Sequence, residues 1–237
     1  MLEKLPAYVN IVFILTTLLT MFIFHWALKN SGNEKLRSKT NIITIILIAW
    51  LFLQGVLSIK GIYSNGTDFM PPKIFLLGIL PNFIMYAWLF LSKSGKVIID
   101  NLPIEKLTYL HLVRIPVEFV LWWLFLNKAI PQIMTFEGWN YDIIMGLTAP
   151  FIIYFGFKKR KISPKMMIAW NAIGILFLIF IFTIAILSSP FPLQQLAFDQ
   201  PNIGILHFPF SWLATFIVPV VVLGHMVSIR QLWMLDA

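Results

Sequence analysis

The sequence predicts an all-α, polytopic integral membrane protein built as a bundle of seven transmembrane helices. Of its 237 residues, 59% are hydrophobic and only 12% are charged, whereas an average soluble domain has roughly 25% charged residues. The apolar residues gather into seven runs, each close to the ~20 residues that a helix needs to cross a bilayer. Nearly every other residue falls in a short connector, so we expect residues 1–237 to form one domain.

The seven predicted spans cover residues 8–28, 41–63, 72–92, 104–130, 138–157, 164–188 and 207–230. Helix-breaking sequences separate them: "NSGNEK" follows the first span, "SNGTDFMPP" the second, "SKSGK" the third and "SSPFPLQQLAFDQPN" the sixth. The basic sequence "KKRK" separates the fifth span from the sixth. The first run has no preceding basic segment and no small-residue cleavage site, so we expect a retained helix and no cleaved signal peptide.

The distribution of basic residues predicts how these helices are threaded. Thirteen of the 18 Lys and Arg residues lie after the first, third, fifth and seventh spans, whereas four lie on the other side and one lies within a span. Because basic loops stay in the cytoplasm, the N-terminus is predicted outside and the C-terminus inside the cytoplasmic membrane. This distribution also explains the net charge of +8, so we expect no nucleic-acid partner.

Two opposite charges, Arg114 and Glu118, fall inside the fourth predicted span, within "HLVRIPVEFVLWW". At about 1.5 Å per residue, both lie near the middle of a ~30 Å hydrocarbon core. Residues four apart share a helix face, and ionisable residues at this depth usually face the bundle interior. We therefore expect the two side chains to pair or to share one ligand. Asn82, beside Pro81 in the third span, offers an amide at a similar depth.

A second group of polar residues lies where the fifth and seventh spans begin, on the predicted outer side. Asn140 and Asp142 begin the fifth span, Glu137 precedes them, and His207 begins the seventh. Carboxylates and a His from two helices can bind a divalent metal or activate a water. His207, Asp142 and Glu137 are therefore candidate metal ligands, although no HExxH-type spacing supports them. Helix capping is the competing explanation for both acids.

Three further histidines, His25, His111 and His225, are predicted nearer the cytoplasm. They can hold haem or a metal, or relay protons, if their helices are neighbours; otherwise each is a separate hydrogen-bonded residue. The chain has no Cys, which excludes thiolate ligands and nucleophiles. Seven helices with the N-terminus outside is also the topology of rhodopsins. The last span has no Lys in its middle, so we expect no retinal Schiff base, and the cofactor stays unassigned.

These residues suggest one function and two alternatives. A pocket with Arg114 and Glu118 at its floor, and with Asn140, Asp142 and His207 at its mouth, suits the binding or transport of a small molecule or ion, which includes proton-coupled transport. The alternative is a membrane-embedded enzyme that acts on a lipid or other apolar substrate through carboxylates, His or a metal. The third is a receptor or sensor subunit that needs a cytoplasmic partner. Expected partners are the bilayer and a small molecule or ion, with an oligomer or partner protein left open.

Overall fold

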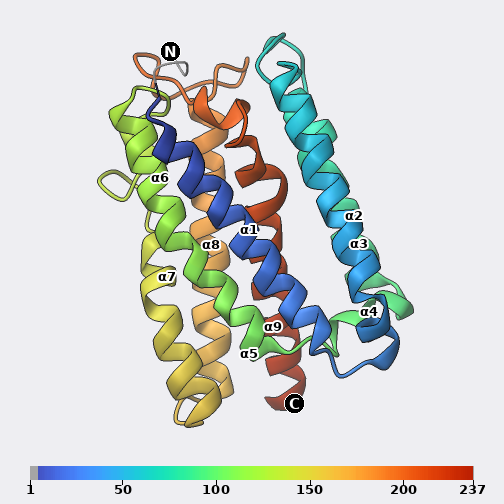
Figure 1. The fold of residues 1–237 in the computed structure, drawn as a ribbon. Coiled ribbons are helices and arrows are strands. Elements are labelled where there is room, and N and C mark those ends of the chain that lie inside the picture. The colour runs from blue at the N-terminus through green and yellow to red at the C-terminus, as the bar shows by residue number, and fades with distance from the viewer. Residues whose placement is uncertain (1–4, 237) are drawn as a thin grey trace.

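The computed structural model describes residues 5–236, and all regular elements in this part of the chain are helical. The helices run up and down one bundle. Helix α1 begins at one end, here called the N-terminal end, and α9 finishes at the opposite, C-terminal end (Figure 1). Within residues 5–236, five helices are long and apolar enough to cross a membrane, or six if one bent pair counts as one span. This indicates a membrane protein. Lys4, which contributed to the predicted orientation, lies outside the described residues.

The first two helices run in opposite directions and diverge towards the N-terminal end of the bundle (Figure 1). Helix α1 (Ala7–Lys29) matches the first predicted span closely. Helix α2 (Glu34–Ile59) begins well before its predicted apolar run. The reason is local capping, because the Asn33 side chain accepts a hydrogen bond of 3.1 Å from the Leu36 backbone N–H and supplies a partner for one free donor of the first turn. Polar residues of the connector thereby become the start of the helix.

The third predicted span is a helix with a sharply bent end. A π-helical turn, Phe75–Ile79 (η2), leads into α3 (Leu80–Leu91), and α4 (Lys93–Ile99) leaves α3 at 93°. Ser92 makes this bend, because its side chain accepts a hydrogen bond of 2.9 Å from the Gly95 backbone N–H and caps α4. A Cβ at Gly95 would lie 2.5 Å from backbone atoms of α3, so glycine permits the close approach that the bend requires.

The fourth predicted span is helical over Ile104–Leu126. It consists of α5 (Ile104–Thr108), a 3₁₀ turn (Tyr109–Val113, η3) and α6 (Arg114–Leu126). It stops four residues short of the predicted end because Lys128 adopts a positive φ of 59°, a conformation that does not continue a right-handed helix.

The fifth predicted span begins later than its apolar run. Residues 135–140 form a turn, in which the Asn140 N–H donates to the Thr135 carbonyl at 3.2 Å. Helix α7 (Asp142–Phe151) follows with ten residues, and a π-helical segment, Ile152–Lys158 (η5), continues it for seven. Because this combined segment is shorter than the five long helices, it is not counted with them as long enough to cross a membrane.

The last third of the chain contributes two long helices. Helix α8 (Pro164–Ser188) has the predicted bounds, with the Ser163 side chain as its N-cap. A long loop then carries a 3₁₀ turn, Gly204–Leu206 (η6), and a π-helical turn, Leu213–Ile217 (η7), leads into α9 (Val218–Asp236). The loop and the 3₁₀ turn Gln132–Met134 (η4) lie at the N-terminal end of the bundle.

Two prolines break the backbone ladder of α3 and of the η7–α9 segment, and side chains of α2 satisfy the carbonyls that they free. A proline lacks an N–H, so the carbonyl four residues before it loses its helical partner. The Gln54 amide donates to the Leu77 carbonyl at 3.1 Å, and the Trp50 indole donates to the Thr215 carbonyl at 3.0 Å. These bonds tie α2 to η2, which precedes α3, and to η7, which precedes α9.

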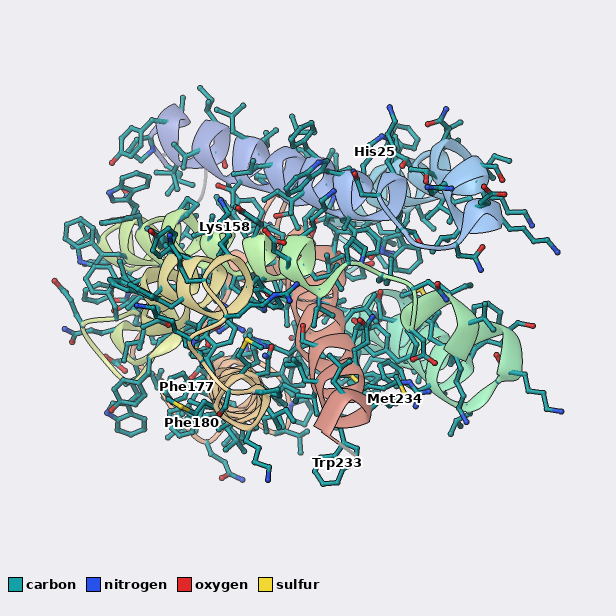
Figure 2. All side chains as sticks on the ribbon, turned by 90° about the horizontal axis from the view of Figure 1, so that it is seen from below. His25, Lys158, Phe177, Phe180, Trp233 and Met234 are labelled. Atoms are coloured by element: carbon teal, nitrogen blue, oxygen red, sulfur yellow. The ribbon has the colours of Figure 1, made fainter. Side chains whose placement is uncertain are left out.

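The outside of the bundle is largely apolar. Phe180 on α8 and Trp233 and Met234 on α9 point away from the bundle (Figure 2), and Trp233 is 67% exposed. Only 22% of the most apolar 18-residue stretch of α2 is buried within the bundle. Large exposed apolar surfaces are uncommon on soluble monomers, which agrees with a bundle surrounded by lipid.

Polar bonds close the C-terminal end of the bundle. Arg230 on α9 forms a bidentate ion pair with Asp100, with N–O distances of 2.6 and 2.9 Å. The neighbouring Gln231 amide donates to the carbonyls of Ile99 and Leu102 at 2.6 and 2.8 Å. The end of α9 therefore holds the connection between α4 and α5 in place.

Candidate functional site

A cavity of about 80 Å³ lies among α6, α7, α8 and η7–α9, which is room for a few water-sized groups. Its polar side chains belong to α6, to the start of α7 and to the turn before it: Arg114, Glu118, Asn140 and Asp142. The remaining walls are apolar, and Met134 and Ile205 line the cavity from the N-terminal end. The cavity thus has one polar side and an otherwise hydrocarbon surface.

Arg114 lies at the centre of the polar side and is only 3% exposed. Its Nη1 lies 3.4 Å from Asp142 Oδ1, and its Nη2 lies 3.1 Å from His225 Nε2. Within the described residues, its Nε has no hydrogen-bond partner. The ion-pair partner of Arg114 is therefore Asp142 on the neighbouring helix and not Glu118 on its own, as the spacing of four residues had suggested.

Glu118 faces the same cavity one turn further along α6 and is 1% exposed. Its Oε1 accepts a hydrogen bond of 2.6 Å from the Asn140 amide. Its Oε2 has no hydrogen-bond partner among the described residues. Asn140 also donates to the Met134 carbonyl and, through Oδ1, accepts from the Asp142 N–H at 3.1 Å. One amide side chain therefore positions Glu118 and accepts from the N–H of the first residue of α7.

His225 continues the polar cluster towards α8. Its Nε2 faces the Arg114 guanidinium, which only donates hydrogen bonds, so Nε2 must be an acceptor without a proton. Its Nδ1 lies 2.8 Å from Asn171 Oδ1 and carries the ring proton, which makes this imidazole neutral. The ring lies against Gly174, where any Cβ would overlap it, so the glycine makes room for the histidine.

His111 stacks on His225 with ring centroids 3.9 Å apart, and Trp170 packs edge-on against His111. The His111 side chain is fully buried, and neither ring nitrogen has a hydrogen-bond partner in the described part of the chain. A charged imidazolium would have no acceptor at this place, and burying an unpaired charge is costly. His111 is therefore assigned as neutral.

Residues expected at three separate depths are thus brought into one continuous cluster. Asn140 and Asp142 contact Glu118 and Arg114, Arg114 contacts His225, and His225 contacts His111. The sequence predicted that Arg114, Glu118, Asn140 and Asp142 share a pocket, but it did not show that His225 and His111 join them.

The remaining candidate residues lie elsewhere. Asn82 donates to the carbonyls of Gly78 and Thr215 at 2.7 and 3.3 Å and so joins helices without lining this cavity. His207 and the exposed Glu137 are also absent from the cavity walls. His25 Nδ1 lies 2.8 Å from Thr44 Oγ1, between α1 and α2.

The weak metal-site hypothesis gains no support from this arrangement. No group of three or more His, Asp or Glu side chains in residues 5–236 is placed to hold a metal ion. Asp142, one of the three candidate ligands, has Arg114 as its charged neighbour instead. A cation such as Arg114 in this position repels a metal ion.

Three residues of the cluster were not among the predicted site residues: Asn171, Trp170 and Gly174, all on α8. The sequence signals were the amide of Asn171 inside an apolar span, at a depth similar to that of Arg114, and its spacing of three residues from Gly174, which places both on one helix face. An amide beside a glycine inside an apolar helix is typical of close helix contact. The Trp170 indole donates to Thr148 Oγ1 at 3.0 Å and ties α8 to α7.

No protein-family model, curated protein or solved structure matches this chain significantly. Function is therefore inferred from the chemistry of the cavity and its surroundings, because a helical bundle by itself does not imply an activity.

Proposed function

We propose that the chain is a seven-helix protein of the cytoplasmic membrane, with the N-terminal end of the bundle outside. The short α7–η5 segment, fifth in chain order, would bring the number of crossings to seven, since it runs along the bundle beside α8 (Figure 1). Seven crossings also agree with the start of α1 and the finish of α9 at opposite ends. Thirteen of the 18 Lys and Arg residues lie in connectors assigned to the cytoplasm, which supports this orientation.

We further propose that this bundle binds and transports a small molecule or ion through the cavity beside Arg114 and Glu118. The observation that carries the proposal is that Arg114 Nε and Glu118 Oε2 are both buried without a hydrogen-bond partner in the described residues. Nearly all buried polar atoms in proteins have a partner, and charged side chains at membrane depth usually serve a function. A donor on a ligand would satisfy Glu118 Oε2, and an acceptor, on the ligand or on a water beside it, would satisfy Arg114 Nε.

The walls suggest the rest of the ligand. Opposite the polar side, the cavity is lined by aliphatic and aromatic side chains of α8 and the η7–α9 segment, including Leu178, Phe182 and Val221. Such a surface favours an apolar body attached to the polar group. The volume of about 80 Å³ restricts the ligand to a small compound.

The alternative enzyme function depended on Asp142, Glu137 and His207 acting together. Since Glu137 and His207 do not line the cavity with Asp142, no observation favours it over binding. Nothing in the described residues specifically favours a sensor either.

The experiment compares two leucine substitutions on α8 in the full chain. Ala185→Leu narrows the cavity, because Ala185 lines it, whereas Ala169→Leu changes an exposed position of the same helix. Small molecules released by denaturing each purified protein are identified by mass spectrometry. A compound retained by the wild type and by Ala169→Leu, but lost from Ala185→Leu, is the expected result.

A second measurement covers the case in which the ligand is lost during purification. The native chain has no Cys, so Ala185→Cys introduces a single thiol at the cavity. We expect it to react with a small water-soluble thiol reagent much faster than Ala149→Cys, which lies in the fully buried core of α7. Equal, negligible reaction at both positions, together with no retained compound, would refute a binding cavity.

A further inference from the structure

The polar cluster has an unbalanced formal charge. Arg114 contributes one positive charge, and Asp142 and Glu118 contribute two negative charges when ionised. His225 is neutral because it accepts from Arg114, and His111 is neutral because it is buried without an acceptor. From α8, the groups that contact the cluster are Asn171 and Trp170, which carry no charge. Full ionisation would therefore leave one uncompensated negative charge.

The position of that excess charge follows from the hydrogen bonds. Asp142 has the Arg114 guanidinium at 3.4 Å, so its carboxylate is paired. Glu118 has only the Asn140 amide on Oε1, and its Oε2 is buried without a partner at the edge of the cavity that Glu118 lines. An isolated carboxylate in an environment of low dielectric is strongly disfavoured, so the group that must be neutralised is Glu118.

We propose that the cavity takes up one monovalent cation at Glu118, which is a proton when no ligand is bound and an alkylammonium or arylammonium group when the ligand is bound. This inference rests on the proposed function and names the ligand class. On binding, the ammonium donates a hydrogen bond to the ionised Glu118, and the proton that Glu118 carried leaves to the solvent. The charge of the cluster is zero in both states, and the apolar walls hold the hydrocarbon part of the amine.

Such an exchange gives a carrier a simple coupling rule. Because a proton and an organic cation compete for one carboxylate, the cavity holds either of them but not both. Movement of one cation in one direction would accompany movement of one proton in the other, without net charge crossing the membrane at this site.

The first test detects the proton directly. Infrared difference spectroscopy of the full chain in liposomes at neutral pH should show the carbonyl stretch of a protonated, buried carboxylic acid. Glu118→Gln should remove this band, whereas Glu137→Gln, a change at an exposed acid, should leave it unchanged. A wild-type spectrum without a protonated carboxylic acid would overturn the proposal.

Charge balance makes two further variants informative. Asp142→Asn removes one negative charge, so Glu118 should become ionised beside Arg114 and its acid band should disappear although Glu118 is still present. Arg114→Met removes the positive charge, so both acids should be protonated and the acid absorption should increase. An unchanged Glu118 band in Asp142→Asn would show that burial alone protonates Glu118, which contradicts an exchange controlled by net charge.

The second test uses three probes of similar shape, benzylamine, benzyl alcohol and benzoate, which are positive, neutral and negative at neutral pH. Benzylammonium should bind, reduce the acid band, and release about one proton per bound molecule into a weakly buffered solution. Glu118→Gln should weaken its binding about tenfold or more, since a charge-assisted hydrogen bond is lost.

Other outcomes separate this inference from the proposed function. If benzoate binds and Ala185→Leu abolishes its binding, the cavity is a ligand site but not a cation site, and only the inference fails. If benzylammonium leaves the acid band unchanged, the exchange is refuted. If Na⁺ removes the band and benzylammonium does not, the cation is a metal ion, and the proposal is also wrong.

Discussion

The buried ion pair between Arg114 and Asp142 should couple the two residues strongly. The N–O distance is 3.4 Å, and the side chains are 4% and 9% exposed. With an effective dielectric constant near 20, the attraction at that distance is about 5 kcal/mol. Removal of either partner takes away this attraction. The protonation change at Glu118 or Asp142 that then balances the charge offsets only part of the about 3–5 kcal/mol that loss of one member of a buried pair typically costs.

A double-mutant cycle measures this coupling. The variants Arg114→Met, Asp142→Asn and their combination are unfolded reversibly in mixed micelles, and the free energy of unfolding is recorded for each. Because the double variant leaves no unpaired charge of this pair, it should lose much less stability than the two single losses together. We expect an interaction energy of about 3 kcal/mol, which is the pair attraction reduced by desolvation.

The chain offers a matched control. Arg37 and Glu34 also form an ion pair at 3.4 Å, but their side chains are 47% and 90% exposed. Arg37→Met, Glu34→Gln and the double variant should give a much smaller interaction energy, as is usual for solvent-exposed pairs. The reasoning is refuted if the coupling at Arg114 and Asp142 is no larger than that of the exposed pair.

Three other predictions concern packing, polar contact and topology. Gly174→Ala should lower the unfolding free energy by about 1–3 kcal/mol, because its Cβ would overlap the His225 ring. In the same assay, the control Gly224→Ala should be neutral or stabilising, because its Cβ would have no neighbour closer than 3.6 Å. Gln54→Leu should destabilise by roughly 1–2 kcal/mol, because it removes the donor to a proline-freed carbonyl; an unchanged stability would mean that this bond is dispensable. Finally, a Cys in place of Arg160 should not react with a membrane-impermeant thiol reagent in intact cells, and rapid labelling would reverse the proposed orientation.

Much of the fold could be predicted because the signals are local. The bounds of α8 agree with the sequence, since Ser163 and Pro164 are good residues for a helix start and an uninterrupted apolar run follows. The bounds failed where capping mattered more than hydropathy. Asn33 extends α2 into a polar connector, and the turn that ends at Asn140 delays the start of α7.

The partners within the site could be predicted only in part. Spacing along one helix suggested that Arg114 pairs with Glu118, because both residues lie on one face. The structure instead places Asp142 beside Arg114, and this choice depends on how α6 and α7 pack. A single sequence shows which residues are too polar for lipid, but the identity of each partner depends on contacts between distant segments.

The position of α9 at the end of the helical order has a consequence for biogenesis. This helix supplies His225 to Arg114, and its backbone carbonyl at Pro219 accepts a hydrogen bond from Tyr86. Arg230 supplies the bidentate contact to Asp100. Because a chain is synthesised from its N-terminus, the earlier helices enter the bilayer before these partners exist. Until α9 is inserted, the groups that it contacts therefore remain exposed to lipid, to water or to the insertion machinery. Their hydrogen bonds can form only when α9 packs against the earlier helices.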